Sequence, residues 1–73
     1  AYRVYPNPAN AQLTIESVKK LGAYKILDIS GAIVSSGTAT NNVVQGIDKL
    51  INGTYILQFI QENTLYHVRF LKE

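Results

Sequence analysis

The 73-residue chain lacks cysteine, methionine and tryptophan altogether. Without cysteine it can form neither a disulfide bond nor a metal site built on thiolates. Small extracellular domains commonly depend on disulfides, so this chain has to gain its stability from packing, from a partner or from fusion to a larger protein. The missing initiator methionine predicts that Ala1 marks a cut or processed boundary of a longer protein.

Charge and long apolar runs are also scarce. Charged residues make up 16% of the chain, and its seven lysines and arginines are scattered, with a net charge of only +2. That positive charge is too small and too dispersed to follow a phosphate backbone, which argues against nucleic acid as a partner. No apolar run approaches the roughly 18 residues that cross a bilayer, and the first residues show no signal-peptide pattern.

The pattern that is present is an alternation of apolar and polar residues, which is typical of half-buried strands. Turn residues separate the candidate strands, and no helical stripe is longer than one turn. We therefore predict an all-β fold, a small antiparallel immunoglobulin-like β-sandwich of about six to seven strands that spans residues 1–73 as one domain. Besides a short strand before Pro6, strands are expected at residues 13–16, 23–29, 32–36, 42–47 (at a sheet edge), 54–61 and 64–71.

The segment of residues 54–61 is the most apolar of these strands. Tyr55, Leu57 and Phe59 share one of its faces, and Ile56 and Ile60 lie on the other. Apolar residues on both faces predict a central strand, or one whose edge is covered by another chain.

The first marked turn is the corner Pro6-Asn7-Pro8. Each proline fixes φ near −65° and lacks a backbone donor, and each favours an extended residue before it. We expect a stiff corner that ends the first strand and fixes how the preceding polypeptide leaves the domain.

Two further turns are marked by their glycines. Asp28 can accept hydrogen bonds from a hairpin backbone whose positive φ is supplied by Gly31. In the segment Leu50-x-x-Gly53-x-Tyr55, a single turn is expected to drop Leu50 into the core. The Asn-Gly pair that ends at Gly53 then reverses the chain.

The residues offer little material for catalysis. His67 is the only histidine, so a nucleophile–base pair would need it. The serines and acids available to it are Ser17, Ser30, Ser35, Ser36, Asp28 and Asp48. No local motif joins them, and backbone capping explains the two aspartates better than calcium ligation. We therefore predict no catalytic, cofactor-binding or metal site, and no enzymatic activity.

The five tyrosines allow two interpretations. Tyr24, Tyr55 and Tyr66 lie at inward positions of the strand pattern, which favours packing with the hydroxyl reaching solvent. Tyr2 and Tyr5 flank the first strand and leave open an aromatic patch that binds sugar or protein.

Four segments, in their order, resemble the C-terminal sorting domains of the type IX secretion system. They are residues 4–9 (VYPNPA) followed by 13–15 (LTI), residues 24–34 (YKILDISGAIV), residues 50–57 (LINGTYIL) and residues 68–72 (VRFLK). The resemblance covers essentially the whole chain. One departure is Ala32, where the family often has lysine or arginine.

The resemblance implies a non-catalytic C-terminal label, without a cofactor, excised here from a larger secreted protein of a Gram-negative bacterium. The fused cargo would enter the periplasm by the general export route. The outer-membrane translocon and its shuttle protein would then recognise the folded label. A sortase-type cysteine protease would commonly remove the label and attach the cargo to the cell surface.

The last strand is the hypothetical surface for recognition. Its outward row and end consist of Leu65, His67, Arg69, Leu71, Lys72 and Glu73. A translocon component could recognise this strand by edge pairing or in a groove. Alternatively the strand only packs, since Tyr66, Val68 and Phe70 point inward. An exposed edge would also allow weak self-association.

A different class of function fits the same residues, namely a β-sandwich module that binds carbohydrate or mediates adhesion in a secreted protein. Tyr2, Tyr5 and the loop of residues 38–42 would then contact the ligand. A stop codon directly after Glu73 in the parent gene would favour the sorting domain, and an internal location would favour the binding module.

Overall fold

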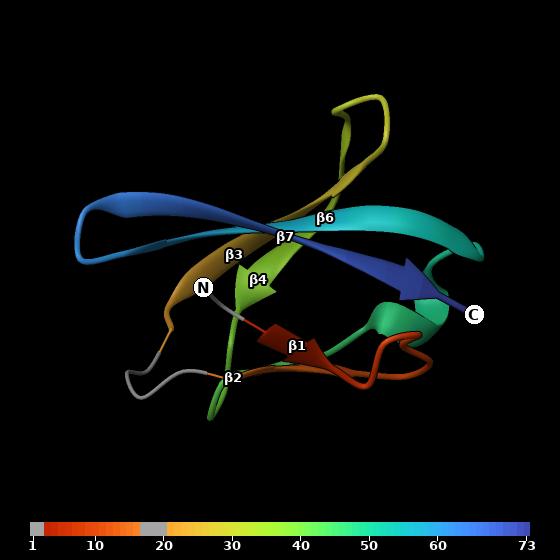
Figure 1. Ribbon diagram of the computed structural model, residues 1–73, viewed down its shortest axis with the longest axis horizontal. Coiled ribbons are helices and arrows are strands. Elements are labelled where there is room, and N and C mark those ends of the chain that lie inside the picture. Colours follow the sequence, from red (N-terminus) through yellow and green to blue (C-terminus); the bar gives the residue numbers. More distant parts are fainter. Residues whose placement is uncertain (1–2, 17–20) are drawn as a thin grey trace.

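The computed structural model of the protein describes residues 3–16 and 21–73, so Tyr2, Ser17 and residues 18–20, between the strands expected at residues 13–16 and 23–29, lie outside it. Figure 1 shows two antiparallel sheets that face each other, which confirms the expected β-sandwich. The small sheet has the strand order β1-β2-β5, and the large sheet has the order β4-β3-β6-β7. The elements are β1 (Arg3–Tyr5), β2 (Leu13–Glu16), β3 (Ala23–Asp28), β4 (Ile33–Thr38), β5 (Val43–Val44), the 3-10 turn η1 (Ile47–Lys49), β6 (Gly53–Gln61) and β7 (Thr64–Lys72).

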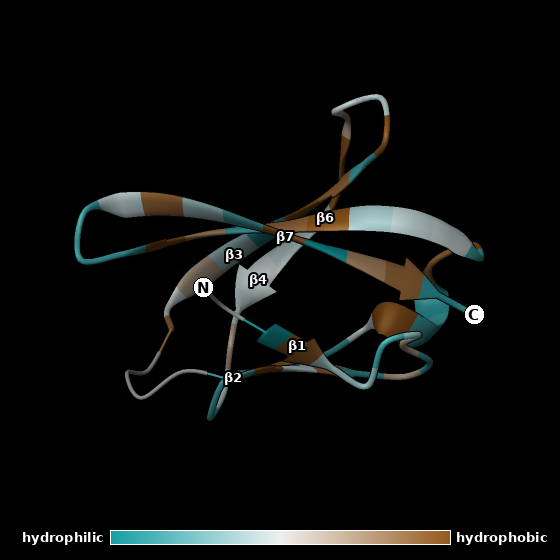
Figure 2. Ribbon diagram, viewed as in Figure 1, coloured by the Kyte–Doolittle hydropathy of each residue, from teal (hydrophilic) through white to brown (hydrophobic). Residues whose placement is uncertain are grey.

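The core lies between the sheets and is built by the alternation along the strands. Figure 2 shows the banding of apolar and polar residues along β6 and β7. The buried apolar side chains of the strands are Val4, Leu13, Ile15 and Val44 from the small sheet, and Tyr24, Ile26, Tyr55, Leu57, Phe59 and Phe70 from the large sheet. Within the described ranges, no helix has the length and apolarity needed to cross a membrane.

The strand β6 occupies the central position that its two-sided apolarity predicts. It pairs with β3 on one side and with β7 on the other. Its inward residues are buried, whereas Ile60 on the outer face is 62% exposed. Glu62 and Asn63 connect β6 to β7 with φ angles of 51° and 63°, as a two-residue hairpin loop requires.

The strand expected at residues 42–47 is much shorter than the sequence predicts. Only Val43 and Val44 pair, at the edge of the small sheet, because Gly46 adopts φ 81° and ends the extended segment. The chain then enters η1, whose Ile47 is fully buried. Leu50, the residue expected to enter the core from this turn, is only half-buried against it.

The strand expected at residues 32–36 is displaced to residues 33–38, so that Gly37 and Thr38 belong to it. Gly37 pairs with Tyr24 inside the β3–β4 ladder. A Cβ atom at Gly37 would lie 2.8 Å from the Tyr24 hydroxyl oxygen, so this glycine makes room for the buried tyrosine ring. A glycine that resembles a loop residue is therefore a packing residue of the strand.

Candidate functional site

The Pro-Asn-Pro corner lies against the end of β7. The Asn7 Oδ1 atom accepts a hydrogen bond from the Leu71 N–H at 2.9 Å. The Ala9 N–H donates to the Leu71 carbonyl at 2.6 Å, and the Glu73 N–H donates to the Ala9 carbonyl at 2.9 Å. Ala9 thereby forms a parallel bridge with Lys72. We call residues 7–9 the latch, because they join the beginning of the chain to its last three residues.

The two prolines explain why the latch pairs in this way. Proline has no N–H, so Pro6 and Pro8 cannot donate to β7, and the pairing uses the Asn7 side chain and Ala9 instead. Both bonds before the prolines are cis. The corner ends β1 at Tyr5, as expected, and the chain then moves from the edge of the small sheet to the edge of the large sheet. Sequence reasoning missed this contact with the last strand.

The Leu-x-x-Gly-x-Tyr corner approaches the same end of β7. The Lys72 Nζ atom donates to the Asn52 Oδ1 atom at 3.3 Å, and Lys72 pairs with Gly53 across the β6–β7 ladder. The Tyr55 hydroxyl donates to the Ile51 carbonyl at 2.6 Å and holds the corner closed. Two corners that are distant in the sequence therefore meet around residues 71–73.

The proposed recognition residues divide between the two faces of β7. Leu65, His67, Arg69 and Leu71 are all exposed on the outer face, as their alternation predicts. Lys72 differs, because it is only 9% exposed: its aliphatic stem lies in the protein while its ammonium group reaches Asn52. Glu73 is exposed beyond the strand.

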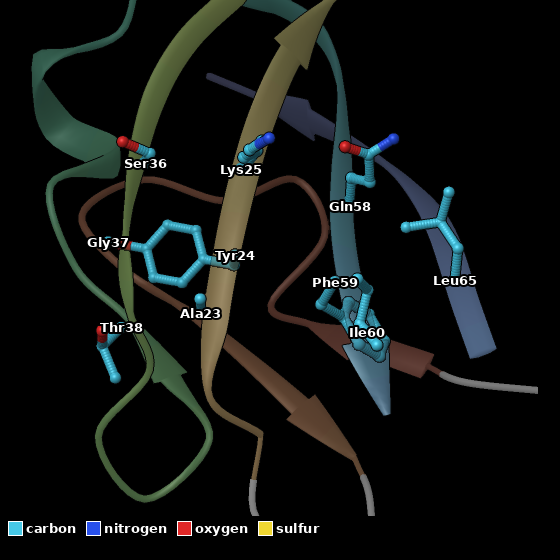
Figure 3. Close-up of a pocket in the computed structure, with 10 residues that line it drawn as sticks. All are labelled: Ala23, Tyr24, Lys25, Ser36, Gly37, Thr38, Gln58, Phe59, Ile60 and Leu65. Carbon is cyan, nitrogen blue, oxygen red and sulfur yellow. The ribbon is translucent and has the colours of Figure 1, made fainter. Parts of the chain in front are cut away.

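A hollow of about 440 Å³ lies on the outer face of the large sheet. Figure 3 shows its lining: Gly37 and Thr38 lie on one side, Ile60 and Leu65 lie on the other, and Lys25 lies between them. No acidic residue lines it. The outer face thus combines apolar side chains with a lysine, and Leu65 connects it to the outward row of β7.

The described part of the chain does not bring His67 close to Ser36, although both belong to the same cross-strand row. Lys25 and Gln58 lie between them, so the two residues are three strand spacings or roughly 14 Å apart. The His67 Nε2 atom instead lies 3.0 Å from the Gln58 Nε2 atom. Among the described residues, no group of three histidine or acidic side chains could hold a metal ion.

Asp28 caps the β3–β4 hairpin, as its sequence predicts. Its Oδ1 atom accepts hydrogen bonds from the Ser30 hydroxyl at 2.6 Å, the Ser30 N–H at 2.9 Å and the Ala32 N–H at 3.0 Å. These bonds, led by the Ser30 hydroxyl, lower the pKa of Asp28 below its ordinary value of 3.8. Gly31 supplies the positive φ, at 93°. The Asp28 carboxylate therefore serves to stabilise the turn.

The residues of the alternative binding site are only partly available. Tyr5 is 48% exposed on the small sheet, in a cross-strand row with Thr14 and Val43. In the loop, the Asn42 side chain accepts the Leu21 N–H at 2.8 Å, so it is already engaged in the structure. Of the three tyrosines expected inside, Tyr24 and Tyr55 are buried and Tyr66 is half-buried.

A family model described as a secretion system C-terminal sorting domain matches residues 3–73. The match includes both corners, the Asp28 hairpin and the whole of β7. A search among curated proteins found no match to the chain.

Proposed function

Because this chain belongs to the family of type IX secretion system C-terminal sorting domains, we propose that β7, held in place by the latch at its end, is the surface by which its cargo is selected for export. A domain of this family is a sorting signal, so it interacts with the type IX machinery and its cargo is secreted or displayed at the cell surface. The observation that supports the location is the convergence of two corners on residues 71–73.

The finer steps follow from the same proposal. The cargo passes through the periplasm, and the outer-membrane translocon and its shuttle protein bind the folded domain. A sortase-type cysteine protease then cuts upstream of β1 and attaches the cargo to the surface. The domain itself takes no catalytic part. Support comes from the exposed outward row of β7 and from the separation of His67 and Ser36 in the folded sandwich.

A reporter fusion tests the proposal. Residues 1–73 are fused behind a periplasmic reporter, in a type IX-competent strain and in a strain without the translocon. We expect reporter outside the first strain only. Deletion of residues 71–73 should trap the reporter in the periplasm, and protease resistance of that pool checks that the sandwich still folds. Export of the folded truncation at the full-length rate would contradict the proposed location, and equal export from both strains would contradict the function.

The second candidate is a carbohydrate-binding or adhesion module, for which the exposed Tyr5 is the supporting observation. Its discriminating test is Tyr5→Ala. This variant should leave export of the reporter unchanged if the domain is a sorting signal, and should abolish retention on glycan or cell-surface columns if it is a binding module.

A further inference from the structure

The backbone of β7 is only partly paired at its outer edge. Both backbone groups of Leu71 point away from β6, since its N–H binds Asn7 and its carbonyl binds Ala9. In an antiparallel ladder, residues at intervals of two direct their backbone groups to the same side. Leu65, His67 and Arg69 therefore also direct their N–H and C=O groups away from β6. Among the described residues, no recorded hydrogen bond reaches these three N–H and three C=O groups.

The burial of the inward side chains of β7 also differs between the end held by the latch and the rest of the strand. Phe70, beside the latch, is 1% exposed. Tyr66 and Val68 also point into the sandwich, but they are only half-buried. Among the residues that the structure describes, none supplies the backbone partners or the side-chain cover that a further strand of the large sheet would provide along residues 65–69.

The charge at this edge indicates which residue types a further strand would need in order to pair there. Arg69 is exposed, and the described residues offer it no ion pair. Leu65 is half exposed on the same face. A strand that covers both needs an acidic residue opposite Arg69 and an apolar residue opposite Leu65 on its outer face. Its alternate residues, which face Tyr66 and Val68, need to be apolar.

We propose that the edge from Leu65 to Arg69 accepts an extended, acidic and apolar segment of a type IX translocon component, which adds to the large sheet as a fifth strand. The inference rests on the proposed function, and it names the mode of recognition. The latch supplies the precedent within the molecule, because Ala9 already pairs with the continuation of this edge at Lys72. Added strands of this kind bind through main-chain hydrogen bonds and gain specificity from alternate side chains.

A proline at residue 67 tests the pairing. The His67 N–H faces outward, so His67→Pro removes a donor that β6 does not use, and edge positions of this kind tolerate proline. In the reporter fusion we expect export to fall at least tenfold for His67→Pro. The matched comparison, His67→Ala, removes the side chain but keeps the N–H donor, so it should lose much less export than His67→Pro. Thermal unfolding of the purified domain checks that His67→Pro folds.

If His67→Pro fails to fold, charge variants of Arg69 test the added strand instead. Arg69 is exposed, so neither Arg69→Glu nor Arg69→Lys should disturb the sandwich. We expect Arg69→Glu to reduce export several-fold and Arg69→Lys to retain it. Native export by a folded His67→Pro, or by Arg69→Glu, overturns the added strand. In either case, export of the unaltered fusion would still support the sorting function. If the unaltered fusion is not exported at all, the sorting function itself is contradicted.

Discussion

The two halves of β7 share one alternation but differ in what surrounds them. Residues 70–72 are held by the latch and by Asn52, and Phe70 and Lys72 are buried there. Among the described residues, only β6 pairs with residues 65–69, and Tyr66 and Val68 are half-buried. The inward pattern alone would predict equal burial along the strand, so the difference comes from the neighbours and not from the residues of β7.

This difference assigns separate tasks to the halves of one strand. Natural proteins protect edge strands by covering them or by placing charges on them. The latch covers one half of β7, whereas the other half has the exposed His67 and Arg69. The covered half stabilises the sandwich, and the charged half stays accessible without becoming a general site of aggregation.

The largest effect is expected from a substitution of a buried core residue in the latched half of β7. Phe70→Ala removes a buried ring that stacks on Tyr55 with 5.8 Å between centroids. Loss of a buried phenylalanine costs about 3–5 kcal/mol, which is comparable to the whole stability of so small a domain. We expect this variant to be largely unfolded in circular dichroism at room temperature.

Leu65→Ala is the matched change in the open half of β7. Because Leu65 is 50% exposed, the free energy of unfolding should change by no more than about 0.5 kcal/mol in urea titrations. Equal losses of stability from Phe70→Ala and Leu65→Ala would mean that the two halves do not differ as the burial indicates.

A smaller effect is expected when the latch loses one hydrogen bond, and the latched half of β7 should then resemble the open half. Asn7→Ala removes the acceptor of the Leu71 N–H, at a cost of about 1 kcal/mol. In hydrogen exchange, the Leu71 amide should then lose its protection and approach the fast exchange expected for Arg69. Asn10→Ala, at an exposed residue of the same loop, is the control and should leave Leu71 protected. Unchanged protection of Leu71 in Asn7→Ala would exclude the latch as its cause.

The local features of the fold were predictable from the sequence. Alternation identified β6 and β7, and the two residues left between the expected strands at 54–61 and 64–71 indicated a hairpin, because strand pattern and turn length are properties of neighbouring residues. The Asp28 hairpin was predictable for the same reason. The extent of β5 was not, since Gly46 ends the extended segment before Ile47, and the apolar residues on both sides of Gly46 suggested a longer strand.

The latch could not be derived from local pattern, because Asn7 and Leu71 are 64 residues apart. Proline chemistry identified a corner at residues 6–8, but it carries no information about which strand the corner meets. The same limit applies to Lys72. Its position after Leu71 suggested a basic end to the strand, while its burial depends on Asn52, which approaches only when β6 pairs with β7.

The smallest effect is expected from lowering the pH, and it should be confined to the part of the large sheet that contains the latched half of β7. Because hydrogen bonds lower the pKa of Asp28 in the folded chain, its carboxylate contributes stability above the unfolded value of 3.8, and this contribution is lost as the pH falls through the folded value. Asp28 lies in a cross-strand row with Tyr55 and Phe70, whereas the row of Val68 and Leu57 contains no acidic residue. As the pH falls below 3.8, the amide chemical shifts of Tyr55 should therefore titrate and those of Leu57 should not. Urea titrations over the same range should reveal a steeper loss of stability for the native domain than for Asp28→Asn. Parallel pH dependence of the two proteins would remove Asp28 as the source, and a titration of Leu57 would mean that acid does not distinguish the two halves of the sheet.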